Sequence, residues 1–329
     1  MNPVATDPPG IELEDVHLDY CGTTALEGVS VGLEGGKIYG LLGRNGAGKS
    51  SLLSLVAAFR RPSAGSVRVG GRPVFEQPDV VSQICLIRET GDTVDAGEPV
   101  SEALAFAARH RRSWDADYAD RLVDRFELPR GTHIGKLSRG KQCALGVTLG
   151  LATRAPVTMF DESYLGMDAP SRYAFYDELL SDYMAHPRTV VVSTHLIEEV
   201  SSLFEEVLIL DRGRLVVHEQ AETLRSRGVS VTGPAPRVDR FVADLGPDAT
   251  VLGTQQLGPT KSTAVYGDLD DDRRAAARSA GLDLGPISLQ DLFVHLTGQP
   301  DDDPAADADA GDGPDPTDPA RPTDPEAVR

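Results

Sequence analysis

The chain has 329 residues, 40% of them hydrophobic, and a formal net charge of −19. This length can hold more than one domain and a sizeable core, whereas the acidic balance disfavours a nucleic-acid-binding surface. No apolar run reaches the ~18 residues that a membrane span needs, and residues 1–10 lack the features of a secretory signal. Three cysteines without metal-ligand spacing indicate reduced thiols. We therefore expect a cytoplasmic protein.

The first part of the chain predicts antiparallel strands, then a buried strand and a helix. Residues 11–18 and 25–33 are short β-like runs, and a turn signal follows them. Residues 37–42 form an apolar run that leads directly into a glycine-rich stretch, and residues 50–59 have the apolar spacing of a helix. The glycine-rich stretch therefore lies between a strand and a helix.

The middle of the chain predicts helices and buried parallel strands, and hence an α/β fold. Residues 97–128 have helical apolar spacing, and a second helix is expected after Ser138. The continuous apolar runs at 157–160 and 189–192 are typical of parallel strands that are covered on both faces. Residues 206–218 predict a hairpin.

A small second domain is predicted over residues 229–298. Its elements are expected in the order strand, helix, strand, strand, helix, strand, at residues 229–232, 236–245, 249–256, 262–267, 269–280 and 282–287. This order is that of a ferredoxin-like α+β unit. An amphipathic helix at 289–296 follows. The acidic tail at 299–329 has ten acids against two arginines, and we expect it to be disordered, like residues 1–10.

A complete phosphate-binding motif, G-x-x-x-x-G-K-[ST], occupies residues 43–50. Backbone N–H groups must approach a triphosphate closely, which glycines permit because they have no Cβ. The helix that follows directs its positive end at the phosphates. Lys49 is expected to reach the β- and γ-phosphates, and the Ser50 hydroxyl to bind Mg²⁺. The predicted ATP contacts in this segment are Gly43, Asn45, Gly46, Ala47, Gly48, Lys49, Ser50 and Ser51.

A pair of acids, Asp161 and Glu162, ends the apolar run at 157–160. Asp161 is expected to hold Mg²⁺, usually through water, and Glu162 to polarise the attacking water as a general base. Alone, such a pair would indicate an acidic turn after a strand. After a phosphate loop it indicates ATP hydrolysis.

Three further segments, in this order and spacing, resemble the ATP-binding subunit of ABC transporters. Leu137-Ser138-Arg139-Gly140-Lys141-Gln142 is similar to the family signature L-S-G-G-Q, Gly166-Met167-Asp168 to the loop after the second acid, and Ser193-Thr194-His195 to the switch histidine. The resemblance covers about residues 11–225. It implies a P-loop NTPase (RecA-like) core with an N-terminal antiparallel β subdomain and a helical signature subdomain at about 90–150. Segments 84–89 and 289–293 resemble bacterial exporters of the multidrug type.

The resemblance also implies roles for single residues. It places Tyr20 against adenine, Glu89 at Mg²⁺ and the permease, and His195 at the γ-phosphate. Ser138, Arg139, Gly140 and Lys141 would contact the ATP of a partner subunit, with Asp168 in the loop beside them. Tyr20 as an ordinary strand aromatic and His195 as a structural residue stay open as alternatives.

Some positions depart from the family pattern. Arg139 and Lys141 replace a glycine and a glutamine of the signature and add positive charge near a γ-phosphate, Ser163 stands in place of a proline, and Glu89 replaces a glutamine. None of them removes the phosphate contacts, the base or the switch histidine. The resemblance therefore implies an active ATPase, whose rate these substitutions can lower.

The function that the resemblance implies is that of a transporter motor with ATP and Mg²⁺ as cofactors. It would lie at the inner face of the membrane, bound to a transmembrane permease, and work as a homodimer or heterodimer because the phosphate loop of one subunit faces the signature of the other. Two alternatives remain. One is a soluble ABC ATPase acting on the ribosome or DNA, which a single motor domain without heptad repeats disfavours. The other is a regulatory module that has lost hydrolysis.

Overall fold

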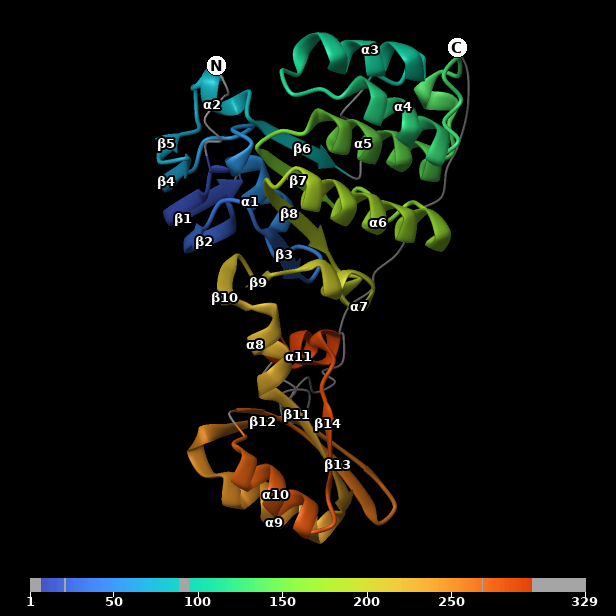
Figure 1. The fold of residues 1–329 in the computed structure, drawn as a ribbon. Helices are drawn as coiled ribbons and strands as arrows, with labels where there is room; N and C mark the ends of the chain where they lie inside the picture. The colour runs from blue at the N-terminus through green and yellow to red at the C-terminus, as the bar shows by residue number, and fades with distance from the viewer. Residues whose placement is uncertain (1–6, 21, 89–94, 268, 298–329) are drawn as a thin grey trace, which may run out of the picture. The chain divides into compact units, whose positions relative to one another are not determined.

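The computed structural model describes residues 7–20, 22–88, 95–267 and 269–297 (Figure 1). A six-stranded sheet in the order β10-β9-β3-β8-β7-β6 forms its centre. Its strands are β3 (Ile38–Gly43), β6 (Ile84–Arg88), β7 (Val157–Asp161), β8 (Thr189–Thr194), β9 (Glu206–Asp211) and β10 (Arg214–Gln220). All neighbours are parallel except β9 and β10. Every residue of β3, β7 and β8 is buried, as their continuous apolar runs predict.

An antiparallel sheet and one helix cover one face of the central sheet. The antiparallel sheet has the order β2-β1-β4-β5, with β1 (Ile11–Tyr20), β2 (Thr23–Leu33), β4 (Ala64–Val69) and β5 (Arg72–Pro73). Helix α1 (Lys49–Val56) packs between the two sheets through three buried leucines and Val56, which share one core with both. The short helix α2 (Pro78–Val81) precedes β6.

Helices cover the other face of the central sheet (Figure 1). They are α3 (Val100–His110), α4 (Ala116–Arg125), α5 (Arg139–Thr153), α6 (Ala169–Ala185) and the short α7 (Ile197–Val200). The sequence predicts one helical stretch over 97–128, but the structure has two helices there. Asp115 caps the second one by accepting a hydrogen bond from the Tyr118 N–H at 2.8 Å. Such a cap starts a new helix rather than continuing the first.

The C-terminal region forms a separate four-stranded antiparallel sheet in the order β12-β13-β11-β14. Its elements are α8 (Ala221–Arg227), β11 (Gly228–Pro234), α9 (Ala235–Leu245), β12 (Ala249–Leu257), β13 (Thr260–Gly267), α10 (Asp271–Ser279) and β14 (Asp283–Pro286). From β11 onward they follow the predicted strand–helix–strand–strand–helix–strand order, which is confirmed. Val229, Val231 and Val265 of the sheet pack with apolar residues of α9 and α10 in a core of their own.

The last helix, α11 (Leu289–Leu296), joins the main core rather than that of the small sheet. Its buried Leu289, Leu292 and Phe293 belong to the same apolar cluster as Ile197 and Val200 of α7. The i, i+3, i+4 spacing places these three side chains on one face of the helix, so α11 anchors the end of the described chain to the core of the central sheet.

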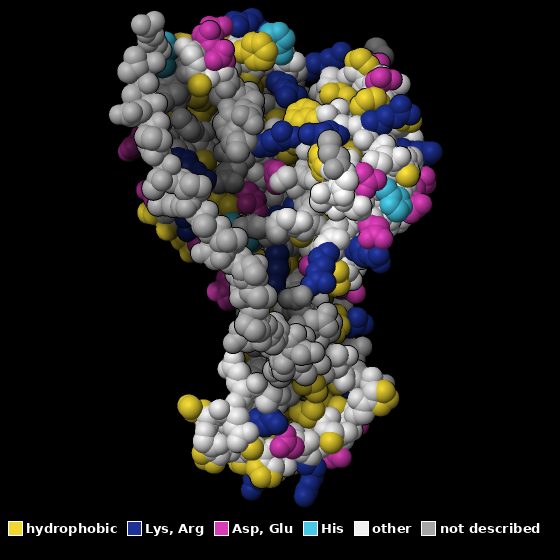
Figure 2. Space-filling view, turned by 180° about the vertical axis from the view of Figure 1, so that it is seen from behind, with side chains coloured by type: hydrophobic (Ala, Val, Ile, Leu, Met, Phe, Trp, Pro, Cys, Tyr) yellow, Lys and Arg dark blue, Asp and Glu magenta, His cyan; other side chains and the backbone are white. Residues whose placement is uncertain are grey.

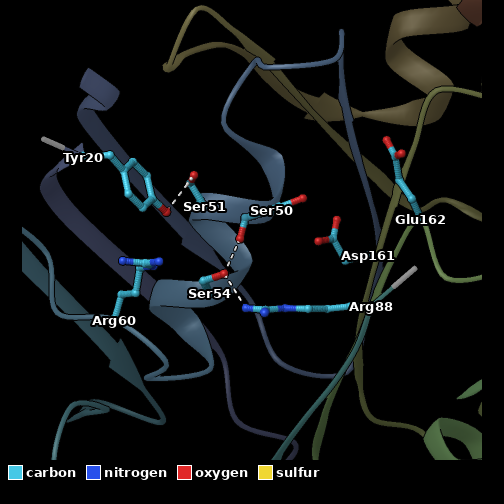
Figure 3. Close-up of a pocket in the computed structure, with 8 residues that line it drawn as sticks. All are labelled: Tyr20, Ser50, Ser51, Ser54, Arg60, Arg88, Asp161 and Glu162. Carbon is cyan, nitrogen blue, oxygen red and sulfur yellow. Dashed lines mark hydrogen bonds between the residues drawn. The ribbon is translucent and has the colours of Figure 1, made fainter. Parts of the chain in front are cut away.

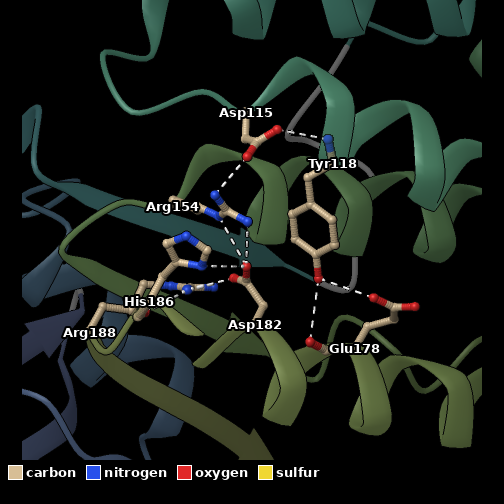
Figure 4. Close-up of polar contacts among 7 residues, drawn as sticks. All are labelled: Asp115, Tyr118, Arg154, Glu178, Asp182, His186 and Arg188. Carbon is tan, nitrogen blue, oxygen red and sulfur yellow. Dashed lines mark hydrogen bonds and ion pairs between the residues drawn. The ribbon is translucent and has the colours of Figure 1, made fainter. Parts of the chain in front are cut away.

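A buried ion-pair network joins α4, α5, α6 and the start of β8 (Figure 4). The Asp182 carboxylate, which is 3% exposed, forms ion pairs with Arg188 Nη1 at 2.7 Å and with Arg154 Nη2 at 2.9 Å. Arg154 Nη1 reaches Asp115 Oδ2 at 2.6 Å, and the His186 ring lies 3.5 Å away from Asp182. Asp182 is therefore the common partner of three cationic or protonatable side chains.

We expect Asp182→Ala to lower the free energy of unfolding by about 3–5 kcal/mol, because it leaves the Arg188 guanidinium buried without its counter-charge. Chemical denaturation measures this loss. Asp120→Ala is the matched control: the Asp120–Arg130 pair is 2.6 Å long, close to the 2.7 Å of the Asp182–Arg188 pair, but both side chains are about half exposed or more. Its removal is expected to change stability by less than about 1 kcal/mol. Equal losses for both variants would contradict the role of burial.

Candidate active site

The phosphate-binding motif forms a tight loop between the end of β3 and the start of α1. Gly46 and Gly48 have φ angles of 82° and 104°, a region that favours glycine. A Cβ on Gly48 would lie 2.7 Å from the Ala25 carbonyl oxygen, so a larger residue is excluded there. The Ala47 N–H donates to the Arg44 carbonyl at 3.1 Å and closes a turn within the loop.

The Lys49 ammonium lies inside this loop. Its side chain is 6% exposed, and Nζ donates to the Gly43 carbonyl at 2.8 Å and the Arg44 carbonyl at 3.3 Å. Nζ also lies 3.1 Å from Glu162 Oε1. The motif lysine and the second acid of the pair, 113 positions apart in the sequence, are therefore in direct contact.

The two acids and the histidine meet because β7 and β8 are adjacent parallel strands whose carboxyl ends lie at the same edge of the sheet. Asp161 is 5% exposed and accepts a hydrogen bond from Ser193 Oγ at 2.6 Å. Glu162 follows in a left-handed conformation, with φ 50°. His195 Nδ1 lies 3.4 Å from Glu162 Oε1, so one carboxylate contacts both Lys49 and His195.

A cavity of about 330 Å³ opens at this edge (Figure 3). It is lined by Tyr20, Ser50, Ser51, Ser54, Arg60, Arg88, Asp161 and Glu162. The Tyr20 hydroxyl and Ser51 Oγ are 3.2 Å apart, which links the end of β1 to α1. The structure thus places Tyr20, Ser50, Ser51, Asp161 and Glu162 around one cavity. Sequence reasoning missed Ser54, Arg60 and Arg88, because no motif includes them.

The model of the ABC transporter family matches residues 26–164, which hold the phosphate loop, the signature and the acid pair. The chain carries the ATP-binding domain of the ABC transporter family. A daunorubicin/doxorubicin resistance ATP-binding protein of Streptomyces peucetius is 29% identical over 304 residues, covering 86% of this chain and 91% of its own. A Nod factor export ATP-binding protein I of Burkholderia lata is 25% identical over 305 residues, covering 88% and 97%.

Solved ABC cassettes share this fold. The structure of an ATP-binding subunit of an ABC transporter matches with a TM-score of 0.59 and 23% identity, over 65% of this chain and 91% of its own. A dimeric cassette bound to ADP and phosphate matches with a TM-score of 0.58 and 20% identity, over 64% and 98%. The fold of this ABC domain is therefore that of a P-loop ATPase.

The signature segment of this ABC domain lies at the start of α5. Ser138 is the N-cap, and its Oγ accepts the Lys141 N–H at 3.3 Å. The Lys141 ammonium donates to the Phe126 carbonyl at 2.6 Å, at the end of α4. The sequence places the Lys141 charge near a γ-phosphate. In the structure the Lys141 ammonium is hydrogen-bonded to a carbonyl of its own subunit. Neither Ser138 nor Gly140 lines the cavity.

The loop with Asp168 lies beside the signature in this ABC domain. The Gly166 carbonyl would be 3.1 Å from a Cβ on Gly140. Asp168 caps α6 by accepting the Ser171 N–H at 2.9 Å, and hydrogen bonds from Ser171 hold the pKa of this carboxyl below its ordinary value. Glu89 lies outside the described residues, so its predicted role is not tested.

The oxygen ligands in the cavity fit a Mg²⁺ ion that also binds substrate phosphates. Among the residues that the structure describes, no three His, Cys, Asp or Glu side chains form a metal cluster. The Ser50 hydroxyl and the Asp161 carboxylate both line the cavity. Mg²⁺ typically takes one or two protein oxygens and completes its shell with water and phosphate.

Proposed function

We propose that this chain binds and hydrolyses ATP as the motor subunit of an ABC transporter whose permease is a separate chain. The observation that carries the proposal is the cavity, which joins Ser50 at the end of the phosphate motif, the acid pair and Tyr20. The proposed motor domain is residues 11–225, with the helical subdomain at about 90–150. The names of the relatives, drug resistance and Nod factor export, favour export.

ATP binding is assigned to the loop and its surroundings. The backbone of residues 43–48 and the Lys49 ammonium hold the phosphates, Ser51 binds them beside Ser50, and Tyr20 stacks on adenine. Ser50 and Asp161 hold Mg²⁺, which neutralises phosphate charge when it is bound. The contact of 3.1 Å between Lys49 Nζ and Glu162 Oε1 supports a general base beside the phosphate site.

Hydrolysis is assigned to Glu162 and His195. The Glu162 carboxylate accepts a proton from the attacking water as a general base. His195, whose Nδ1 lies 3.4 Å from that carboxylate, orients it and contacts the γ-phosphate. The left-handed φ of Glu162 is a strained conformation of the kind that often occurs at functional positions.

The active unit is proposed to be a dimer. Ser138 and Gly140 form the start of a 15-residue helix, where N–H groups can bind an anion, yet neither residue lines the cavity of its own chain. The partner's phosphate site is the anion that they would meet, with Arg139 and Asp168 at the same contact. A homodimer provides two such composite sites.

The transporter assignment can be distinguished from a function on the ribosome or on DNA. None of the described helices is long and apolar enough to cross a bilayer. Figure 2 shows acidic side chains beside the basic ones on the face in view, without a continuous basic band among the described residues, which disfavours a nucleic-acid surface. A permease would therefore hold the chain at the inner face of the membrane.

The test is isolation of the tagged chain from detergent-solubilised membranes of its source organism. We expect a polytopic membrane protein in a fixed ratio to the chain, and ATP hydrolysis that rises when that protein is present. Recovery only with ribosomes or nucleic acid would contradict the transporter assignment.

The small domain, residues 229–298, is proposed to stabilise the fold or the dimer rather than to bind a ligand. Its support is α11, whose buried side chains share the core of the ATPase domain with α7. The solvated acidic end predicted for residues 299–329 lies outside the described residues.

A further inference from the structure

Arg88, the last residue of β6, extends across the nucleotide cavity (Figure 3). The parallel register pairs it with Asp161 of β7, and side chains of paired residues lie on the same face of a sheet. Its Nη2 donates to Ser54 Oγ at 2.9 Å, and Ser54 Oγ donates to the Ser50 carbonyl at 2.5 Å. Arg88 is thereby connected to the helix that carries the phosphate loop.

The charge of Arg88 has no carboxylate partner among the described residues. Its guanidinium stacks on the Phe59 ring, 4.8 Å from the centroid, and its Nε is buried without a hydrogen-bond partner. Lys49, by contrast, is paired with Glu162, and Asp161 accepts from Ser193. Arg88 is thus a cation of the cavity that forms no ion pair with a described carboxylate.

Such a charge acts unequally on the two forms of the nucleotide. ATP has about four negative charges near neutral pH and about two when Mg²⁺ is bound. A nearby cation therefore strengthens the binding of free ATP more than the binding of MgATP.

We propose that Arg88 is a positioning residue that holds α1 through Ser54 and adds a positive charge to the nucleotide cavity, so that ATP binding depends less on Mg²⁺. The inference rests on the proposed ATP site. It concerns the relative affinities for ATP and MgATP, not whether the site binds nucleotide.

The experiment measures the Kd of ATP in EDTA and the Kd of MgATP by titration calorimetry. It uses Glu162→Gln as the reference protein, so that ATP is not consumed. The quantity compared is the Kd of ATP in EDTA divided by the Kd of MgATP. Adding Arg88→Met is expected to raise this ratio roughly threefold to tenfold, because the lost charge affects the more highly charged form more strongly. Adding Arg88→Lys, which keeps the charge and loses the planar fork, is expected to restore most of the reference ratio.

Arg61→Met is the matched control. Arg61 stacks on Phe75 at 5.9 Å and does not line the cavity, so its removal is expected to leave the ratio unchanged. A purely structural role of Arg88 predicts that both Kd values shift by the same factor, or that lysine behaves like methionine; either result overturns the proposal. A reference protein that binds neither form would instead contradict the proposed ATP site.

Discussion

Glu162→Gln is expected to lower the rate of ATP hydrolysis by about a hundredfold or more, the usual contribution of a general base, and to leave MgATP binding nearly intact. Glutamine has the size of glutamate but cannot accept the proton of the attacking water. The substitution also removes the negative charge that pairs with Lys49 at 3.1 Å, so the lysine becomes freer to bind phosphate. Phosphate release measures the rate, and calorimetry measures the binding.

Glu198→Gln is the matched control for this prediction. Glu198 is an exposed acid in α7, three residues after His195, and the same chemical change there is expected to leave hydrolysis at the parental rate. A Glu162→Gln protein that hydrolyses ATP as fast as the parent would remove Glu162 from the role of base.

Lys49→Ala is expected to weaken ATP binding roughly a hundredfold, as the loss of about 3 kcal/mol of charge-assisted hydrogen bonding predicts. The Lys49 ammonium is almost fully buried at the loop, so no other described lysine can replace it there. Fluorescence titration with an ATP analogue measures the change, and circular dichroism checks that the variant is folded.

Lys136→Ala, at an exposed position outside the cavity, controls for the loss of a positive charge. It is expected to bind ATP like the parent. A folded Lys49→Ala protein with parental affinity would show that the nucleotide binds elsewhere.

The sequence predicts those parts of the fold whose signals are local. The loop at 43–50 is recognisable because its glycines and lysine are contiguous, and the ferredoxin-like order of the small sheet follows from short alternating segments. Helix α6 was not predicted, although it has 17 residues. Its buried Phe175 and Leu179 are mixed with exposed Tyr173, Leu180 and Met184, so its apolar periodicity is weak.

Contacts between distant segments could not be predicted. Arg88 reaches Ser54 across 34 positions, and Arg188 and Arg154 converge on Asp182 from different elements. These groups come together only because α1 packs on the strands, and because the end of α5 and the residue before β8 lie beside α6. The direction of the Lys141 ammonium depends in the same way on the Phe126 carbonyl, which sequence spacing does not reveal.

We propose that ATP is hydrolysed at a site shared by two copies of the chain. Mixing two inactive variants, Lys49→Ala and Gly140→Asp, is the sharpest test of this shared site. Asp is well tolerated in the first turn of a helix, and a Cβ on Gly140 requires only a small shift of the Gly166 carbonyl, 3.1 Å away. The new carboxylate would repel the γ-phosphate of the partner.

In a mixed dimer, the intact loop of the Gly140→Asp chain faces the intact signature of the Lys49→Ala chain, so one composite site is complete. Phosphate release from the mixture is measured against each variant alone. The mixture is expected to regain part of the parental activity. A mixture as inactive as its two components would contradict a site shared between two copies of this chain.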